Sequence, residues 1–227
     1  MPHGLFITFE GTEGGGKTTQ LGLLAESLRE RGRTVRAVRE PGGTPLGEEI
    51  RHTLKHSAEN QAITAETELL LMNASRAQLV REVIRPALAA GEIVLCDRFY
   101  DSTLAYQGYG RGLDLKRAQS VIDFAVGDTR PDLTLLLHLP VAASESRRKA
   151  RDATANPIRD RFEESDREFF ERVERGFLAI AKADPRRVKI IDATASIQDV
   201  SAEIWKNVQA LLGNKGIKVR ARGKSGH

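Results

Sequence analysis

The residues best suited to chemistry lie in a glycine-rich segment near the start of the chain, GTEGGGKTTQ at 11–20. Gly11, Gly16, Lys17 and Thr18 match the pattern G-x-x-x-x-G-K-[ST]. Small residues let backbone N–H groups converge on phosphate oxygens, the lysine reaches the β- and γ-phosphates, and the hydroxyl binds Mg²⁺. The pattern therefore predicts a nucleoside triphosphate site along the whole loop: Gly11, Thr12, Glu13, Gly14, Gly15, Gly16, Lys17, Thr18 and Thr19.

A second part of this site is expected after the apolar run EIVLCD (92–97). Ligands of open α/β sheets bind at the carboxyl ends of the strands, so Asp97 is placed to join Thr18 in the Mg²⁺ shell. Arg98 follows where it can meet a phosphate. The alternative is that Asp97 only caps a turn.

Arginines gather in SRRKARDATANPIRDRF (146–162), around a stretch of small polar residues and one proline. With a phosphate loop in the same chain, we interpret residues 147–162 as a mobile flap that closes over the transferring phosphates. Closure excludes water and stabilises the negative transition state. A solvated, charged surface is the alternative.

Two further stretches favour an acceptor that itself carries a phosphate. REPGGTPLGEEIR (39–51) brings Glu40 and Arg51, and DRFYDSTLAYQGYGRG (97–112) brings hydroxyls, a phenol and an amide. An amide and an arginine can recognise a base edge, while aromatic rings pack against a sugar. Both stretches also fit ordinary surface loops.

The elements that must position these residues alternate along the chain. Five apolar runs predict strands at 5–9, 34–38, 92–97, 132–139 and 187–192. Helical patterns cover 18–32, 64–91 (bent near Pro86), 114–127, 165–183 and 196–213. Alternation predicts crossover connections and a mainly parallel sheet, and almost continuously apolar strands indicate helices on both faces. We expect one α/β domain over residues 1–213, with no linker or internal repeat.

Composition and charge limit the remaining possibilities. The net charge of +4 includes five lysines and arginines within residues 214–227, so the body of the chain is near neutral. We therefore expect residues 214–227 to form a basic, poorly ordered tail. The alternative is that this tail contacts nucleic acid. One cysteine, Cys96, and no signal-like or bilayer-length apolar segment favour a cytoplasmic protein without membrane association.

Two common classes of nucleotide-binding protein lack their motifs here. The Asn-Lys at 214–215 has no following aspartate of a guanine-reading Asn-Lys-x-Asp, which argues against a switch GTPase. A Ser-Gly-Gly-Gln motif of transporter-type ATPases is absent from the sequence. A non-catalytic nucleotide-binding regulator remains as an alternative to an enzyme.

GTEGGGKTTQ, REPGGT, SRAQ, DRFYDSTLAYQG, RPDLTL, DRFE and IDAT occur in this order over residues 5–212, and together they resemble bacterial thymidylate kinase. The resemblance implies a P-loop nucleoside monophosphate kinase fold with a five-stranded parallel sheet. It also implies transfer of the ATP γ-phosphoryl group to dTMP with Mg²⁺, and a homodimer. A relaxed pyrimidine nucleoside monophosphate kinase is the alternative within enzymes.

The resemblance also implies roles for single residues. Arg51 and Arg98 would grip the dTMP phosphate, Arg76 and Gln107 would approach thymine O4 and N3, and Tyr106 would pack on the deoxyribose. The full expected dTMP site is Glu13, Glu40, Arg51, Arg76, Arg98, Ser102, Tyr106 and Gln107. The expected adenine side is Arg147, Asp192, Ala193 and Thr194, and the expected catalytic residues are Lys17, Asp97, Arg98, Arg151 and Arg161.

The chain departs from the family pattern at two positions. Met72 stands where a phenylalanine usually stacks on the base, which predicts weaker or less selective base binding because a thioether is less rigid than a phenyl ring. His138 stands where many relatives have an acid, and we expect no role for it. No arginine occurs at positions 12–15 of the phosphate loop, so the resemblance is to the group with its catalytic arginine in the flap, Arg151 being the first choice.

Overall fold

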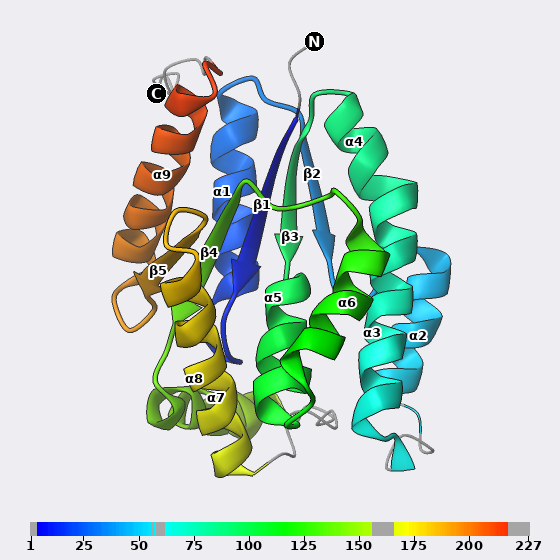
Figure 1. Cartoon of the computed structure of the whole chain (residues 1–227). Helices are drawn as coiled ribbons and strands as arrows, with labels where there is room; N and C mark the ends of the chain where they lie inside the picture. The colour runs from blue at the N-terminus through cyan, green and yellow to red at the C-terminus, as the bar shows by residue number, and fades with distance from the viewer. Residues whose placement is uncertain (1–3, 56, 58–61, 156–165, 218–227) are drawn as a thin grey trace.

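A computed structural model describes residues 4–55, 57, 62–155 and 166–217, except for the side chains of 148 and 151–155. Within these residues, one parallel sheet has the strand order β2-β3-β1-β4-β5. The strands are β1 (Leu5–Glu10), β2 (Val35–Arg39), β3 (Ile93–Asp97), β4 (Leu133–His138) and β5 (Val188–Asp192). Each boundary lies within one residue of the expected one, and the predicted α/β fold class is confirmed (Figure 1).

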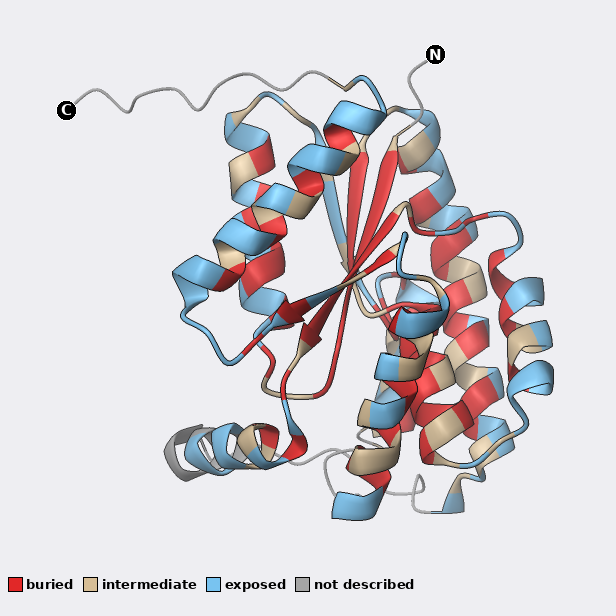
Figure 2. Cartoon of the chain, turned by 60° about the vertical axis from the view of Figure 1, so that its left-hand side comes forward, coloured by how far each residue is buried: buried red, intermediate tan, exposed pale blue. Residues whose placement is uncertain are grey.

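Helices pack on both faces of the sheet. They are α1 (Lys17–Glu30), α2 (Pro45–Lys55), α3 (Ala65–Leu79), η2 (Val80–Ile84), α4 (Arg85–Ala89), α5 (Tyr100–Thr103), η3 (Leu104–Gly110), α6 (Leu115–Val126), α7 (Val141–Ala155), α8 (Arg167–Ala183) and α9 (Ile197–Asn214). Buried residues form stripes on the helices that face the sheet (Figure 2). The central strands β1, β3 and β4 are buried almost throughout, whereas the edge strands β2 and β5 are partly exposed.

The core has a separate apolar cluster on each side of the sheet. Alternate residues of β1, such as Ile7 and Phe9, pack with α1 and α9 on one face. Phe6 points to the other face, where it packs with α3, η2 and α6. A third cluster joins β4 to η3 and α8 and includes Tyr106. Side chains alternate between the two faces of a strand, so one apolar run supplies both layers.

The sheet brings the carboxyl ends of its central strands together. In the parallel register, Phe9 of β1 lies beside Asp97 of β3, and Glu10 lies beside Leu136 of β4. The loop that follows β1 and the turn that follows β3 therefore open on the same edge of the sheet, where ligands of such folds bind.

The helices differ from expectation in three places. The long helix expected at 64–91 is interrupted by a π-helical segment, η2, directly before Pro86. A proline ring clashes with the carbonyl one turn earlier, and a wider turn relieves that clash. Residues 100–110 are α- and π-helical rather than a loop, and the first part of the expected flap is helix α7.

The end of α9 extends into the expected tail. Asn214 is its last residue, Lys215 forms an ion pair with Asp132 at 2.9 Å, and Ile217 packs against the core. Residues 218–227 lie outside the described part of the chain. Among the described helices, none is both long and apolar enough to cross a bilayer.

Candidate active site

The glycine-rich loop between β1 and α1 depends on conformations that only glycine adopts freely. Gly11 has φ of 130°, and a Cβ atom there would lie 2.3 Å from the carbonyl oxygen of Leu137. Gly16 is left-handed and precedes α1, which has no side-chain N-cap. The first N–H groups of α1 are therefore directed toward the loop, where they and the helix dipole favour an anion.

Lys17 is held inside this loop. Its Nζ atom donates hydrogen bonds to the carbonyl oxygens of Gly11 (3.1 Å) and Thr12 (2.9 Å). Burial and the neighbouring Arg98 lower the pKa of Lys17 to about 8. The ammonium group thus lies at the bottom of the loop, at short reach from any phosphate that the loop holds.

Thr18 and Asp97 lie next to each other at the start of α1. The hydroxyl of Thr18 donates to Oδ2 of Asp97 at 2.7 Å. Mg²⁺ prefers oxygen ligands and is usually held by one or two protein groups together with phosphates and water. An exposed hydroxyl and a half-buried carboxylate at the mouth of a phosphate loop fit this chemistry, so these two residues are suited to hold Mg²⁺.

Arg98 adopts an unusual backbone conformation, with φ of 68°. Its guanidinium group donates to the carbonyl of Gly11 and to Ser102 through Nη1, and to Glu13 (2.7 Å) and Tyr106 (3.3 Å) through Nη2. Burial raises the pKa of Glu13, but Arg98, Lys17 and Lys55 outweigh it and lower that pKa to about 2. Arg98 thus joins the phosphate loop to the helix after β3.

Glu10 fixes the turn that contains Arg98. It is fully buried at the end of β1 and accepts hydrogen bonds from the backbone N–H of Phe99 (2.7 Å) and the hydroxyl of Ser102. Burial and the nearby Asp101 raise the pKa of Glu10 to about 8. Since Ser102 also accepts from Arg98, Glu10 orients Arg98 through one intermediate side chain.

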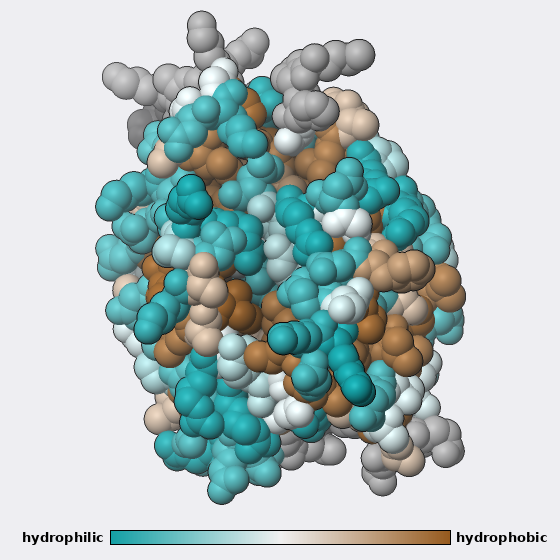
Figure 3. All heavy atoms as spheres, viewed as in Figure 1, coloured by the Kyte–Doolittle hydropathy of each residue, from teal (hydrophilic) through white to brown (hydrophobic). Residues whose placement is uncertain are grey.

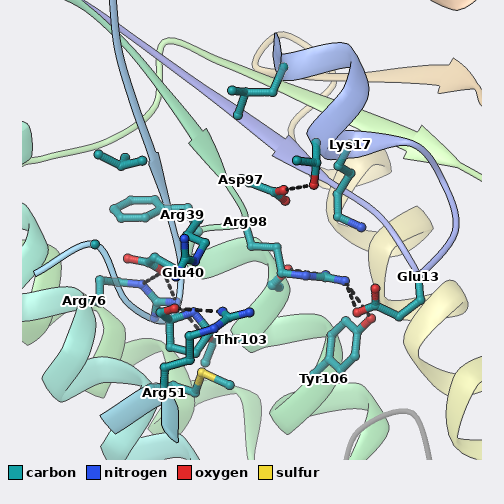
Figure 4. A pocket seen from close by; sticks show the side chains of 18 of the residues that line it. Glu13, Lys17, Arg39, Glu40, Arg51, Arg76, Asp97, Arg98, Thr103 and Tyr106 are labelled. Carbon is teal, nitrogen blue, oxygen red and sulfur yellow. Dashed lines mark hydrogen bonds and ion pairs between the residues drawn. The ribbon is translucent and has the colours of Figure 1, made fainter. Parts of the chain in front are cut away.

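A cavity of about 790 Å³ runs from the phosphate loop to α2, α3 and η3 (Figure 4). All residues expected to bind the acceptor line it: Glu13, Glu40, Arg51, Arg76, Arg98, Ser102, Tyr106 and Gln107. Of the expected phosphate-loop residues, Gly14, Gly16, Lys17, Thr18 and Thr19 also line it, whereas Gly11, Thr12 and Gly15 do not. The two groups of sequence-predicted residues therefore share one cavity.

At the far end of this cavity, Arg76 and Glu40 form a buried ion pair. The guanidinium group contacts Oε2 of Glu40 at 2.7 and 2.8 Å, and also donates to Asn73 and Thr103. Burial raises the pKa of Glu40 to about 7 against the opposing effect of Arg76. These partners hold the planar guanidinium group of Arg76 in one orientation.

The expected adenine side lies outside this cavity but next to the phosphate loop. Arg147 donates to the carbonyl oxygens of Gly14 (3.2 Å) and Ala193 (2.9 Å), and so connects α7, the loop and the turn after β5. Asp192 accepts from the N–H and hydroxyl of Thr194 within that turn. The side chain of Arg151 and the whole of Arg161 lie outside the described part of the chain.

The cavity also contains residues that the sequence analysis did not single out. These residues are Arg39, Lys55, Phe99 and Thr103. Met72, which the sequence analysis did single out, also lines the cavity. Arg39 and Thr103 belong to the motifs REPGGT and DRFYDST, so their positions within those motifs were the available signal. Half-buried His138, by contrast, lies 2.9 Å from Glu174 and does not line the cavity.

The fold and the site together define a P-loop kinase of the nucleoside monophosphate kinase class, with a phosphate loop at one end of a cavity and a buried arginine at the other. A family model described as Thymidylate kinase matches residues 9–204. The chain belongs to the thymidylate kinase family, as the resemblance implied.

Individual relatives agree with this assignment. The chain is 51% identical over 209 residues to a thymidylate kinase of Pseudomonas syringae pv. tomato, covering 92% of this chain and 97% of that protein. It is 50% identical over 213 residues to one of Desulforudis audaxviator, covering 93% of each. The crystal structure of thymidylate kinase from Ehrlichia chaffeensis matches with a TM-score of 0.72 and 38% identity, covering 92% of this chain and 99% of that one.

Proposed function

We propose that this protein transfers the γ-phosphoryl group of ATP to dTMP, forming ADP and dTDP. One observation carries the proposal beyond family membership: the phosphate loop and the complete set of expected acceptor residues line a single cavity. In-line transfer requires donor and acceptor phosphates to meet, and a shared cavity allows this.

On the donor side, the loop N–H groups and Lys17 bind the β- and γ-phosphates. Thr18 and Asp97 hold Mg²⁺, which neutralises charge on the phosphate oxygens. The 2.7 Å contact between their oxygens supports this pairing. Asp97 and Lys17 thereby keep the donor phosphates in one orientation.

On the acceptor side, Arg98 and Arg51 bind the phosphate of dTMP, since planar guanidinium groups match phosphate oxygens. Arg98 already lies at the loop, bonded to Gly11, which supports a position between the two phosphates. Tyr106 packs on the deoxyribose, while Arg76 and Gln107 contact the base. Glu13, Glu40 and Ser102 hold these side chains in place.

The arginines of the flap, Arg151 and Arg161, stabilise charge on the transferring group, and Arg147 with Asp192, Ala193 and Thr194 forms the adenine side. The start of α7 supports this, because Ser144 donates to the carbonyl of Glu13 at 2.6 Å and Arg147 contacts Gly14. We assign residues 1–213 to one kinase domain with a flap at 147–162, and residues 214–227 to a peripheral tail.

We also propose that the protein is a homodimer. Exposed apolar side chains lie on three neighbouring helices: Leu46 on α2, Leu70 on α3, and Leu115 and Phe124 on α6. In Figure 3, apolar surface lies on the side of the molecule where α3 and α6 are found. Such a surface is typical of a contact with another protein, and the family is usually dimeric.

The test is ADP release in a coupled assay with Mg·ATP and dTMP, dUMP, UMP, CMP, AMP or GMP in turn, with and without EDTA. We expect strong preference for dTMP and loss of turnover without Mg²⁺. Comparable rates with dTMP and dUMP would contradict dTMP specificity and support a relaxed pyrimidine kinase. Absence of turnover with every acceptor, despite ATP binding, would refute the kinase assignment.

A further inference from the structure

Glu68 is a fully buried carboxylate on α3 that has no role in the site described so far. Its Oε1 atom accepts a hydrogen bond from Nε2 of Gln107, and the two atoms are 2.7 Å apart. Arg111 lies on its other side, with contacts of 3.4 and 3.3 Å to the two carboxylate oxygens. An acid therefore lies directly behind the glutamine expected at the base.

The chemistry of this contact determines how the amide of Gln107 is oriented. A carboxylate paired with an arginine only accepts hydrogen bonds, whereas a side-chain amide has one donating and one accepting end. The NH₂ group must therefore face Glu68. The carbonyl oxygen Oε1 is left for the cavity, and it accepts no hydrogen bond from any described residue.

The other degrees of freedom of Gln107 are already restricted. The residue is 1% exposed within the π-helical segment η3, which packs closely against α8. Arg111 is itself held over the ring of Phe169, with its guanidinium carbon 4.5 Å from the ring centroid. Rotation of the amide is the remaining choice, and Glu68 is the group that decides it.

We propose that Glu68 is a specificity-determining positioning residue, which makes Gln107 present only a hydrogen-bond acceptor to the base. This inference rests on the proposed function. Thymine and uracil carry an N–H donor at N3, whereas cytosine has an unprotonated acceptor there. Glu68 thereby selects 4-oxo pyrimidines without touching the substrate, because a cytosine N3 would face another acceptor and leave both groups unpaired.

The experiment compares kcat/KM for dTMP and 5-methyl-dCMP, which share the methyl group, O2 and the sugar phosphate. Where 5-methyl-dCMP turns over too slowly, its inhibition constant against dTMP replaces its KM. Glu68→Gln removes the acceptor-only group and keeps the shape, so the amide of Gln107 loses its fixed orientation. Glu66→Gln is the matched control, because Glu66 lies on the same helix and is exposed.

We expect Glu68→Gln to reduce the preference for dTMP by about tenfold, the scale of one lost hydrogen-bond discrimination, through KM rather than kcat. Glu66→Gln should leave the preference unchanged. If the single variant fails to fold, the double variant Glu68→Gln/Arg111→Gln removes the unbalanced charge and tests the same point. The ratio is measured on one preparation, so a reduced folded fraction does not alter it.

A preference within threefold of wild type in a folded variant would overturn the proposal. Equal losses for both nucleotides would also overturn it, because they would indicate a purely structural role. Absence of dTMP turnover by the wild-type protein would instead refute the proposed function, and this inference with it.

Discussion

Replacing Arg187 by methionine tests how much a buried ion pair contributes to the scaffold of the site. Arg187, just before β5, contacts both carboxylate oxygens of Asp101 on α5, at 2.6 and 2.9 Å. The side chains of Asp101 and Arg187 are 2% and 15% exposed. The pair thus joins the start of β5, at one edge of the sheet, to α5, which lies between Arg98 and Tyr106 in the chain.

The expected cost follows from this burial. Removing one partner of a buried pair costs about 3–5 kcal/mol, because the other charge stays buried without compensation. In the variant, Asp101 still accepts a hydrogen bond from the hydroxyl of Thr134 at 3.3 Å. We therefore expect a loss of stability at the lower end of this range. For a chain of this length, about 3 kcal/mol corresponds to a fall in Tm of roughly 6–12 °C.

Thermal unfolding followed by circular dichroism would measure this change. The control is Arg167→Met, because Arg167 forms a surface ion pair with Glu171 at 2.9 Å. The Tm of this control variant should fall by at most about 2 °C. Adding Asp101→Asn to Arg187→Met should restore part of the stability, since a neutral amide is less costly to bury. A fall below about 3 °C, or no recovery in the double variant, would refute the reasoning.

Four further predictions concern the site and the assembly. Gly11→Ala places a methyl group against Leu137 and should lower kcat/KM about 100-fold, as a displacement near 1 Å does; near-normal kinetics would contradict this. Met72→Phe should lower the KM for dTMP, and an unchanged KM would count against a base-stacking position at residue 72. Arg151→Ala should lower kcat more than it raises KM, whereas a purely raised KM would remove Arg151 from the transition state. Phe124, 85% exposed, should lie in the dimer contact, so Phe124→Glu should elute as a monomer in size-exclusion chromatography with light scattering, and an unchanged dimer would exclude this face.

Local sequence was sufficient for the strands, the phosphate loop and α1. Apolar runs such as LFITF and the glycine pattern after it predicted β1, the phosphate loop and α1, and each strand was located within one residue. These features depend on neighbours in the chain: runs of consecutive apolar residues, the glycines of the loop, and the spacing of Lys17 and Thr18. The motif order also predicted the family, and hence the acceptor residues that line the cavity.

Only the tertiary structure decided how those side chains are held. The bonds of Glu10 to Phe99, of Glu68 to Gln107 and of Arg187 to Asp101 each join residues far apart in the chain. Which acid lies opposite which donor depends on strand register and helix packing. Burial then makes each contact matter, because a polar group removed from water must find its partner inside the protein. Local periodicity carries no record of such pairings.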